Sequence, residues 1–326
     1  MCTALTYKNG DSYFGRNMDI GYSFNEEVVI TPRNYPITYK KNKTSTKHYA
    51  MIGIACVINN YPLYADAINE KGLGVAGLNF PCYAHYNEEL IEDKYNITPY
   101  EIIPWILGEC ASVEEAKILL NNLNVYAEPF ATGLELATLH WIISDKEKSI
   151  VLESTKDGIK IYDNPVGVMT NNPKFDFHLT NLSNYINCNA IDFQKKDVLG
   201  MEVMPLGHGT GGLGLPGDTS TTSRFVKAVF AKANSHCEKT EIANISQFFH
   251  ILDTVAVPRG FATVKDGVYD YTTYTTCANQ NTAVFYYKTY ENSQISAVDM
   301  NKENLNFSEL IRYKMVLEQQ INRINA

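Results

Sequence analysis

The chain has 326 residues, of which 45% are apolar and 20% are charged, and its net charge is −8. This length and apolar content allow a large core in one domain or two. The acidic balance, without a basic stripe, argues against nucleic acid or an anionic membrane surface as partner. No run of 18 apolar residues is present, so we expect no membrane insertion.

The N-terminus and the cysteines bear on location. The first residues lack the basic and apolar regions of a signal peptide. The seven cysteines are irregularly spaced, with no CxxC and no metal-ligand spacing, which is typical of reduced thiols. We therefore expect a cytoplasmic protein without a metal. Six of the cysteines are expected to be small buried apolar side chains, and Cys2 is treated separately below.

The predicted elements begin with a β-hairpin around Asn9-Gly10, the strongest short turn signal. Ser112 to Glu115 form a capping box that starts a helix. In chain order, we predict strands over 3–8, 12–17, 28–31, 49–57, 64–68 and 74–78, helices over 99–108 and 116–123, strands over 138–144, 149–153, 159–162 and 167–170, helices over 173–182, 219–232 and 245–255, and strands over 271–277, 283–290 and 295–300.

This order lacks the regular alternation of strand and helix that builds a parallel sheet. Two antiparallel sheets covered by helices fit it better, in an α+β fold. The chain shows no repeat, no low-complexity tract and no linker, so residues 1–326 are predicted to form a single domain.

A cysteine directly after the initiator methionine can be a chance occurrence or can serve as an N-terminal nucleophile. Removal of Met1 would leave Cys2 with a thiol and a free α-amine. An α-amine has a reference pKa near 7.7–8.0, so part of it is neutral at pH 7 and can accept the thiol proton. Nucleophile and base would then belong to one residue.

The second hairpin strand brings Arg16 and Asp19 beside Cys2. A guanidinium near a thiol favours the thiolate, and a carboxylate orients an ammonium group. A salt bridge between Arg16 and Asp19 at a strand end is the simpler alternative. Asn79 and Asn171 are likewise open to two interpretations, as neutral hydrogen-bond donors to an oxyanion or as turn caps.

Eight long motifs lie between Met1 and Leu305. They are MCTALTY, YFGRNMD, NEKGLGVAGLNFP, HWIISDKEKSIVLE, YDNPVGVMTNNP, GLPGDTSTTSRF, FFHIL and TYENSQISAVDMNKENL. In this order they resemble the choloylglycine hydrolase family of N-terminal-nucleophile hydrolases, which holds bile salt hydrolases and penicillin V acylases. The resemblance implies a four-layer αββα sandwich, a homotetramer, no cofactor, and cleavage of a non-peptide amide.

The resemblance also assigns roles by residue. Cys2 matches the nucleophile, and Arg16 and Asp19 match the pair that positions its thiol and amine. Asn171, directly after Thr170 and beside Asn172, matches the amide donor of the oxyanion hole. Asn79 matches a residue on the oxyanion side of the site. Arg224 matches an arginine, distant in the sequence, that supports the group of residues around the nucleophile.

The implied substrate is a small molecule, a bile salt conjugated to glycine or taurine. Its apolar steroid calls for a largely apolar pocket, although an apolar residue near a turn is more often part of the core. Penicillin V acylase is the alternative, disfavoured because such relatives often carry Tyr at position 79, and a non-catalytic bile-acid or lipid binder is the third option. The candidate contacts are Met18, Ile20, Phe24, Ile58, Ala65, Phe130 and Leu134.

Two further patterns are discounted. Gly207 to Gly212 fits G-x-G-x-x-G but lacks the preceding strand and following helix of a dinucleotide site. His140 and His250 show no zinc spacing and are interpreted as satisfied core or half-buried side chains.

Overall fold

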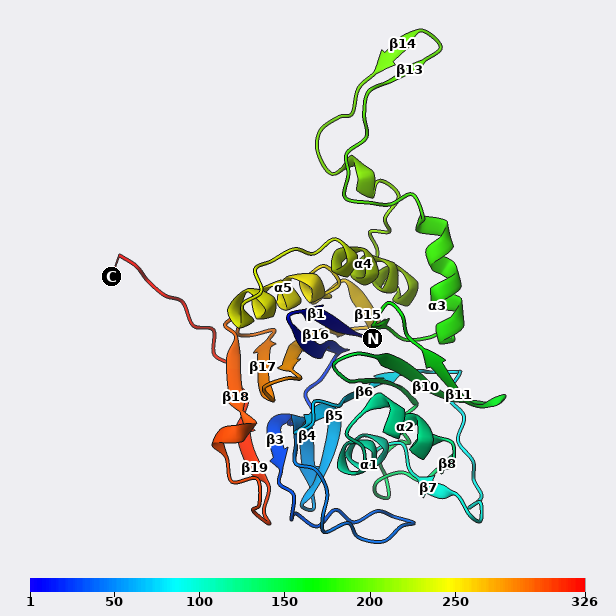
Figure 1. Cartoon of the computed structure of the whole chain (residues 1–326), viewed down its shortest axis with the longest axis vertical. Coiled ribbons are helices and arrows are strands. Elements are labelled where there is room, and N and C mark those ends of the chain that lie inside the picture. Colours follow the sequence, from blue (N-terminus) through cyan, green and yellow to red (C-terminus); the bar gives the residue numbers. More distant parts are fainter. Residues whose placement is uncertain (326) are drawn as a thin grey trace.

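The computed structural model of the protein describes residues 1–325 and stacks two large sheets between layers of helices (Figure 1). Ala326, the last residue of the predicted domain, lies outside the described residues. None of the helices in residues 1–325 is both long and apolar enough to cross a membrane.

The first sheet has seven strands, and all of its pairings are antiparallel. The predicted N-terminal hairpin is confirmed, and Gly10 forms its turn with φ 79°. In spatial order its strands are β12 (Val168–Met169), β1 (Cys2–Asn9), β2 (Asp11–Ile20), β16 (Val268–Asn279), β17 (Val284–Thr289) and β18 (Ser296–Asp299), and β15 (Ala262–Lys265) pairs with β16.

The second sheet has eight strands and is also antiparallel throughout. Its far edge is closed by a strand from the C-terminal part of the chain. In spatial order its strands are β11 (Gly158–Asp163), β10 (Ser149–Thr155), β9 (Leu139–Ser144), β6 (Gly74–Asn79), β5 (Tyr61–Asn69), β4 (Met51–Ile58), β3 (Glu27–Thr31) and β19 (Ile311–Lys314).

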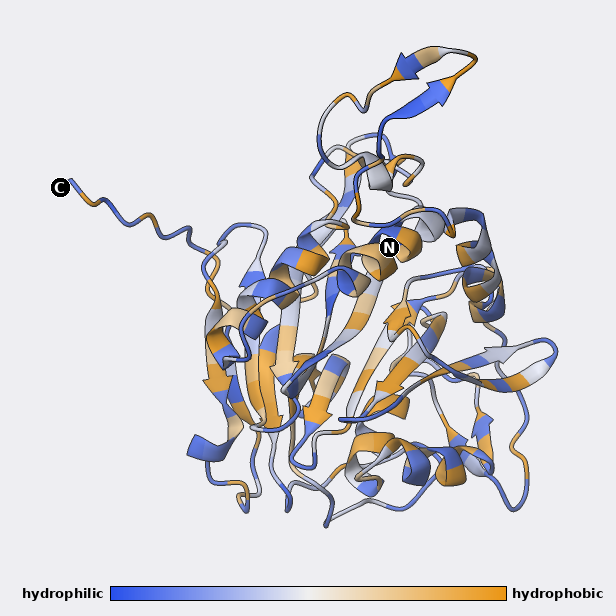
Figure 2. Cartoon of the chain, turned by 45° about the horizontal axis from the view of Figure 1, so that its top comes forward, coloured by the Kyte–Doolittle hydropathy of each residue, from blue (hydrophilic) through white to orange (hydrophobic). Residues whose placement is uncertain are grey.

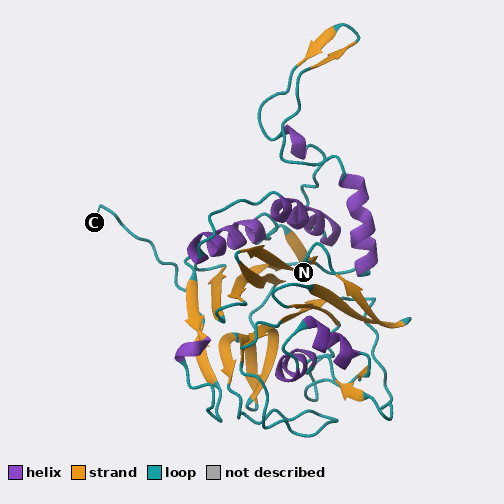
Figure 3. Ribbon diagram, viewed as in Figure 1, coloured by secondary structure: helices purple, strands orange, loops and turns teal. Residues whose placement is uncertain are grey.

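Helices cover the outer face of each sheet (Figure 3). Helices α3 (Phe175–Asn181), α4 (Thr221–Ala233) and α5 (Glu241–Asp253) lie on the side of the first sheet, and α1 (Ile102–Glu109) packs on the second sheet beside α2 (Val113–Leu120). The expected four-layer αββα sandwich is therefore confirmed. It buries both faces of its central strands, and residues 12–19 of β2 are all buried. Burial on both faces removes the alternation of polar and apolar residues.

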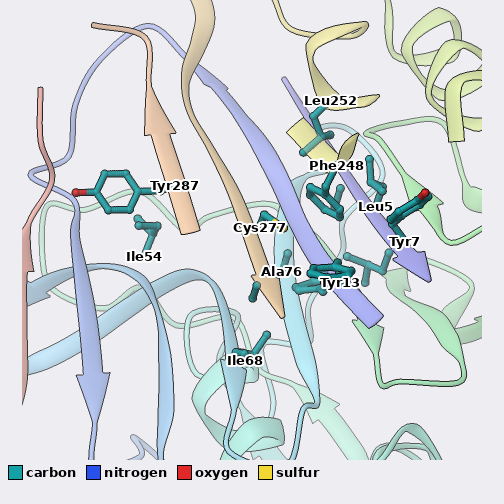
Figure 4. Packing of buried hydrophobic residues seen from close by; sticks show 14 of the residues in the cluster. Leu5, Tyr7, Tyr13, Ile54, Ile68, Ala76, Phe248, Leu252, Cys277 and Tyr287 are labelled. Atoms are coloured by element: carbon teal, nitrogen blue, oxygen red, sulfur yellow. The ribbon is translucent and has the colours of Figure 1, made fainter. Parts of the chain in front are cut away.

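The apolar core forms two clusters. One fills the space between the sheets and continues under α4 and α5, and Figure 4 shows Ile54, Ile68 and Ala76 of the second sheet, with Phe248 and Leu252 of α5, among its members. The other lies between the second sheet and α1 and α2. Full burial of each large apolar side chain contributes about 1.5–3 kcal/mol. Cys2 belongs to the first cluster, so the site is built into the core.

Most predicted elements are present with shifted ends. The capping box at Ser112 is confirmed, since its hydroxyl accepts from the Glu115 N–H, but α2 begins at Val113 and ends before the predicted limit of 123. Residues 123–125 form a strand instead, because they pair with an earlier segment. The sequence analysis missed the short strand pairs β7 (Tyr95–Ile97) with β8 (Leu123–Val125) and β13 (Lys196–Val198) with β14 (Met201–Val203), and the 3₁₀ turns Leu182–Tyr185, Thr210–Gly212 and Met300–Lys302.

Candidate active site

Cys2 is the first residue of β1, and the hairpin register places it directly opposite Met18. Its side chain is 4% exposed, and its Sγ lies 3.8 Å from the Met18 Sδ. The same register sets Ala4 opposite Arg16. The local hairpin thus brings Cys2 next to the Arg16–Asp19 segment, as the sequence predicts.

Met1 continues the pairing beyond Cys2. Its α-amine donates to the Asp19 carbonyl at 2.7 Å and pairs with Asp270 at 3.4 Å, while its own carbonyl accepts from the Asp19 N–H at 3.0 Å. The Cys2 N–H donates to Asn171 Oδ1 at 2.8 Å. Removal of Met1 would convert this N–H into the free amine and leave Asn171 in place to accept from it.

Arg16 is fully buried in β2, and it makes no ion pair within 4.0 Å in residues 1–325. Its Nη1 donates to Gly77 O at 2.6 Å and to Ala65 O at 3.1 Å, both on the second sheet, and Nη2 lies 3.5 Å from Met18 Sδ. The strand-end salt bridge to Asp19 is therefore absent. Burial alone would lower the pKa of Arg16, but nearby acidic groups, with Cys2 first, raise it.

Asn171 is held in one orientation by its partners. Its Oδ1 accepts from the Cys2 N–H and from Arg224 Nη2, each at 2.8 Å, and its Nδ2 donates to the Asn79 carbonyl at 2.7 Å. Because the oxygen faces two donors, the amide nitrogen must face Asn79. Asn79 itself is exposed, and its Oδ1 accepts from the Thr138 hydroxyl at 3.0 Å.

Arg224 enters the site from the second turn of α4 and is fully buried. Its Nη1 donates to the Cys2 carbonyl at 2.5 Å and to the Thr3 hydroxyl at 2.7 Å. Burial lowers the pKa of this guanidinium, and Asp19 opposes that effect from 3.9 Å. Arg224 therefore connects β1, Asn171 and Asp19.

Asp19 has one satisfied and one open carboxylate oxygen. Its Oδ1 accepts from the Thr272 hydroxyl at 2.6 Å. Its Oδ2 is buried and has no hydrogen-bond partner among the described residues. An unpartnered buried carboxylate oxygen is costly, and a cationic amine at Cys2 would supply a nearby charge for it.

Three side chains that the sequence analysis did not assign hold the Asn171 loop. His140 Nε2 lies 2.9 Å from the Thr170 carbonyl, and His178 Nε2 lies 3.0 Å from the Asn171 carbonyl. Glu153 Oε1 accepts from the Phe175 N–H at 2.9 Å. His140 and Glu153 are the two ends of the motif HWIISDKEKSIVLE, so the sequence could have indicated them as site residues. His178 lies outside every motif, and only the fold places it here.

The predicted substrate contacts fall into two groups. Ile20, Phe24 and Ala65 pack against the cluster that contains Cys2, beside Met18. Phe130 lies in the loop before β9, with its ring 5.5 Å from that of Tyr61, which pairs with Ile58 across the β4–β5 turn. Leu134 is 46% exposed in the same loop. These residues stay predictions as substrate contacts.

Within residues 1–325, no group of three His, Cys, Asp or Glu side chains is arranged to hold a metal ion. The buried polar groups around Cys2 are instead arranged as hydrogen-bond donors and one open carboxylate oxygen, which suits acyl transfer through a tetrahedral oxyanion.

Known proteins are similar to this chain over its full length. A bile salt hydrolase/transferase of Lactiplantibacillus plantarum is 49% identical over 325 residues, covering 100% of both chains. A bile salt hydrolase/transferase of Clostridium perfringens is 43% identical, again over 100% of both chains. A crystal structure of the conjugated bile acid hydrolase from Clostridium perfringens superposes with a TM-score of 0.94 at 43% identity, covering 100% of each chain.

A penicillin V acylase from Agrobacterium tumefaciens shares the fold, with a TM-score of 0.73 at 20% identity over 96% of this chain and 91% of that one. The family model for linear amide C–N hydrolases of the choloylglycine hydrolase family matches residues 2–313. The resemblance drawn from the motifs is confirmed, and the chain belongs to the choloylglycine hydrolase family of linear amide C–N hydrolases.

Proposed function

We propose that the protein is a bile salt hydrolase, which cleaves the amide bond between a bile acid and glycine or taurine. The observation that carries this proposal is full-length identity of 49% and 43% to two proteins named bile salt hydrolase/transferase. The hydrogen-bonded group of Cys2, Asn171 and Arg224 supports the same chemistry.

In the proposed mechanism, the α-amine of processed Cys2 takes the thiol proton, and the thiolate attacks the amide carbonyl. The tetrahedral oxyanion accepts a hydrogen bond from Asn171 Nδ2. One N–H of this amide donates to the Asn79 carbonyl, and the second N–H is available for the oxyanion, which would lie on the Asn79 side of the site. One such donor stabilises the transition state by roughly 3–4 kcal/mol. The α-ammonium then gives its proton to the leaving amine, and water hydrolyses the thioester.

The other residues have supporting roles in this proposal. Arg16 stabilises the thiolate from beneath Cys2, and Asp19 holds the α-ammonium with its open Oδ2. Arg224 holds the Cys2 carbonyl and Asn171 together. Met18, Ile20, Phe24, Ile58, Ala65, Phe130 and Leu134 contact the steroid.

A second activity is supported by the names of two relatives, which include transferase. A thioester on Cys2 can be attacked by an amine as well as by water, because aminolysis is the reverse of acylation. The amine would form the new amide bond, and the Cys2 thiol would leave. We propose that free amino acids compete with water at this step.

The experiment uses protein whose mass confirms the loss of Met1. Release of glycine and taurine from conjugated cholate is measured, alongside release of phenoxyacetate from phenoxymethylpenicillin, and isotope-labelled glycine is added with unlabelled substrate to detect transfer. Rapid release of glycine or taurine, lost in the Cys2→Ala variant, is the expected result. Activity that persists in Cys2→Ala would contradict the mechanism.

Other results separate the alternatives. Preferential penicillin cleavage would favour the acylase, and tight binding of bile salt without product would favour the binding protein. Failure of labelled glycine to enter product would contradict the transferase proposal alone.

We also propose that residues 1–326 act as one domain in a homotetramer in the cytoplasm. Support for assembly comes from an arm, defined as residues 186–206, whose hairpin β13–β14 projects from the body (Figures 1 and 2). Leu199 and Leu206 are 103% and 104% exposed on it, and such apolar patches mark interaction surfaces. All seven cysteines are free, which supports a reducing compartment. The expectation that the six beyond Cys2 are buried is wrong for four of them, because Cys82 is exposed and Cys56, Cys188 and Cys237 are half-buried.

A further inference from the structure

A β-bulge in β5 lies directly across from Arg16. Ile54 pairs with Asp66 and Ala55 with Tyr64, so Ala65 is the extra residue on the bulged strand. A bulge frees backbone groups from the ladder and re-aims neighbouring side chains, and bulges are common beside active sites. Here the freed Ala65 carbonyl accepts from Arg16 Nη1 at 3.1 Å.

The next residue, Asp66, brings a carboxylate into the space between the sheets. It is 1% exposed and lies in a row with Ile54 and Ala76, both inner-face residues of the core. Its Oδ2 accepts from the Thr276 hydroxyl at 2.8 Å, and that hydroxyl accepts from the Arg16 N–H at 3.1 Å. Asp66 is therefore connected through a single hydroxyl group to the backbone of Arg16, and its effect on the guanidinium is that of a nearby buried charge.

The buried guanidinium of Arg16 is near enough to both Cys2 and Asp66 for each of them to raise its pKa. It has no carboxylate within 4.0 Å in the described residues, and the acidic groups that act on it are Cys2, Tyr274, Asp66 and Asp19, in decreasing order. One buried positive charge can fully balance one negative charge nearby, because burial makes every further charge costly. Cys2 and Asp66 therefore compete for the same guanidinium.

The surroundings of Asp66 contain few other charges. Arg16 on β2 and Tyr274 on β16 are the titratable groups that face it, and the flanking strands β4 and β6 contribute Ile54 and Ala76. Asp66 Oδ1 and the Tyr274 hydroxyl both lack a hydrogen-bond partner in residues 1–325. Burial raises the pKa of Asp66 to about 6, and the charge of Arg16 and the hydrogen bond from the Thr276 hydroxyl oppose that effect.

We propose that Asp66 is a positioning residue for Cys2 that acts through Arg16. Ionised Asp66 partly neutralises the positive charge of Arg16 and so makes the Cys2 thiolate less favourable. Neutral Asp66 has no such effect, and Arg16 then stabilises the thiolate more strongly. This inference rests on the proposed function only in taking Cys2 as the reactive thiol. Asp66 would thereby add a residue of the second sheet to the proposed site around Cys2 on the first sheet.

The test measures the rate at which iodoacetamide alkylates Cys2 as a function of pH, in protein that lacks Met1 and without substrate. Peptide mass mapping separates Cys2 from the other cysteines. The Asp66→Asn variant keeps the shape of the side chain and removes its charge. We expect the midpoint of the alkylation curve to move to lower pH by about half a unit, which is about threefold faster alkylation below the midpoint.

Two further variants complete the design. Thr276→Val removes the hydroxyl that favours ionised Asp66, so a smaller shift in the same direction is expected, and it serves if Asp66→Asn does not fold. Glu101→Gln makes the same kind of change at a buried carboxylate that bonds Thr98 and Lys40 in the other core cluster, and it should leave the midpoint in place.

Unchanged midpoints in Asp66→Asn and Thr276→Val would overturn the inference, as would an equal shift in Glu101→Gln. Because the assay uses no bile salt, a shifted midpoint in a protein without amidase activity would uphold the role of Asp66 and contradict the proposed function instead.

Discussion

Replacing His178 with glutamine tests the hydrogen bonds behind the Asn171 loop. The imidazole is 1% exposed, stacks on Phe225 and has no partner for Nδ1 in the described residues. Burial lowers its pKa from 6.5 to about 4, aided by the positive charge of Arg224. Glutamine is neutral at every pH and keeps an N–H donor for the Asn171 carbonyl.

The magnitude follows from linkage between protonation and folding. Below about pH 6.5 the unfolded chain binds a proton at His178, whereas the folded chain stays neutral there until about pH 4. The free energy of unfolding therefore falls as the pH falls through this window. A shift of about 2.5 units corresponds to about 3 kcal/mol.

Asp66 contributes with the opposite sign in nearly the same window. Its folded-state pKa is raised from 3.8 to about 6, so stability present below pH 3.8 is lost as the pH rises through 6. This loss is also about 3 kcal/mol. The two effects largely cancel in the native protein. His178→Gln is expected to reveal the Asp66 effect as stability that rises on acidification.

The assay is urea unfolding followed by circular dichroism at several pH values between 4 and 6.5. Relative to the native protein, His178→Gln should lose about 3 kcal/mol less of its unfolding free energy across this range. His250→Gln is the matched control, because His250 is exposed in the last turn of α5 and its interpretation as a core or half-buried side chain is wrong. Equal pH dependence in the His178→Gln and native proteins would refute the reasoning.

Three other substitutions have defined outcomes. Arg224→Lys can replace only one of the hydrogen bonds made by the guanidinium, so kcat should fall about 100-fold with the melting temperature as a check on folding, and an unchanged kcat would contradict its role. Gly15→Ala would place a Cβ atom 2.1 Å from the carbonyl oxygen of Thr276, so we expect the free energy of unfolding in urea to fall by about 3 kcal/mol. Native-like stability would show that β2 and β16 can move apart to admit the methyl group. The double substitution Leu199→Ser and Leu206→Ser should lower the molar mass measured by light scattering and leave the rate of Cys2 alkylation unchanged. An unaltered molar mass would show that the arm does not hold the oligomer together.

Local signals in the sequence were sufficient for the nucleophile hairpin. Asn9-Gly10 specifies a tight turn, and a hairpin with a tight turn fixes its own register. This is why Arg16 and Asp19 could be placed beside Cys2 before the structure was known. The capping box at Ser112 is another local feature, and its hydrogen bond is present.

Pairings between distant segments were not predictable in the same way. Residues 271–279 of β16 pair with residues 13–20 of β2, and β19 pairs with β3, across more than half of the chain in each case. Strands buried on both faces carry no alternation that would specify a neighbour. The strands β15 and β19 were not predicted at all, and the other long strands were predicted without their order in the sheets.

The sequence by itself determined the family, the N-terminal hairpin and the proposal of Cys2 as nucleophile, because a hairpin turn, a helix cap and a family motif are each specified by residues close together in the chain. Only the tertiary structure decided that the Thr276 hydroxyl joins Asp66 to the backbone of Arg16, that His178 contacts the Asn171 carbonyl, and that Asp19 Oδ2 makes no hydrogen bond in the described residues. Burial and hydrogen bonding between sheets set these properties, and both depend on which segments meet in space.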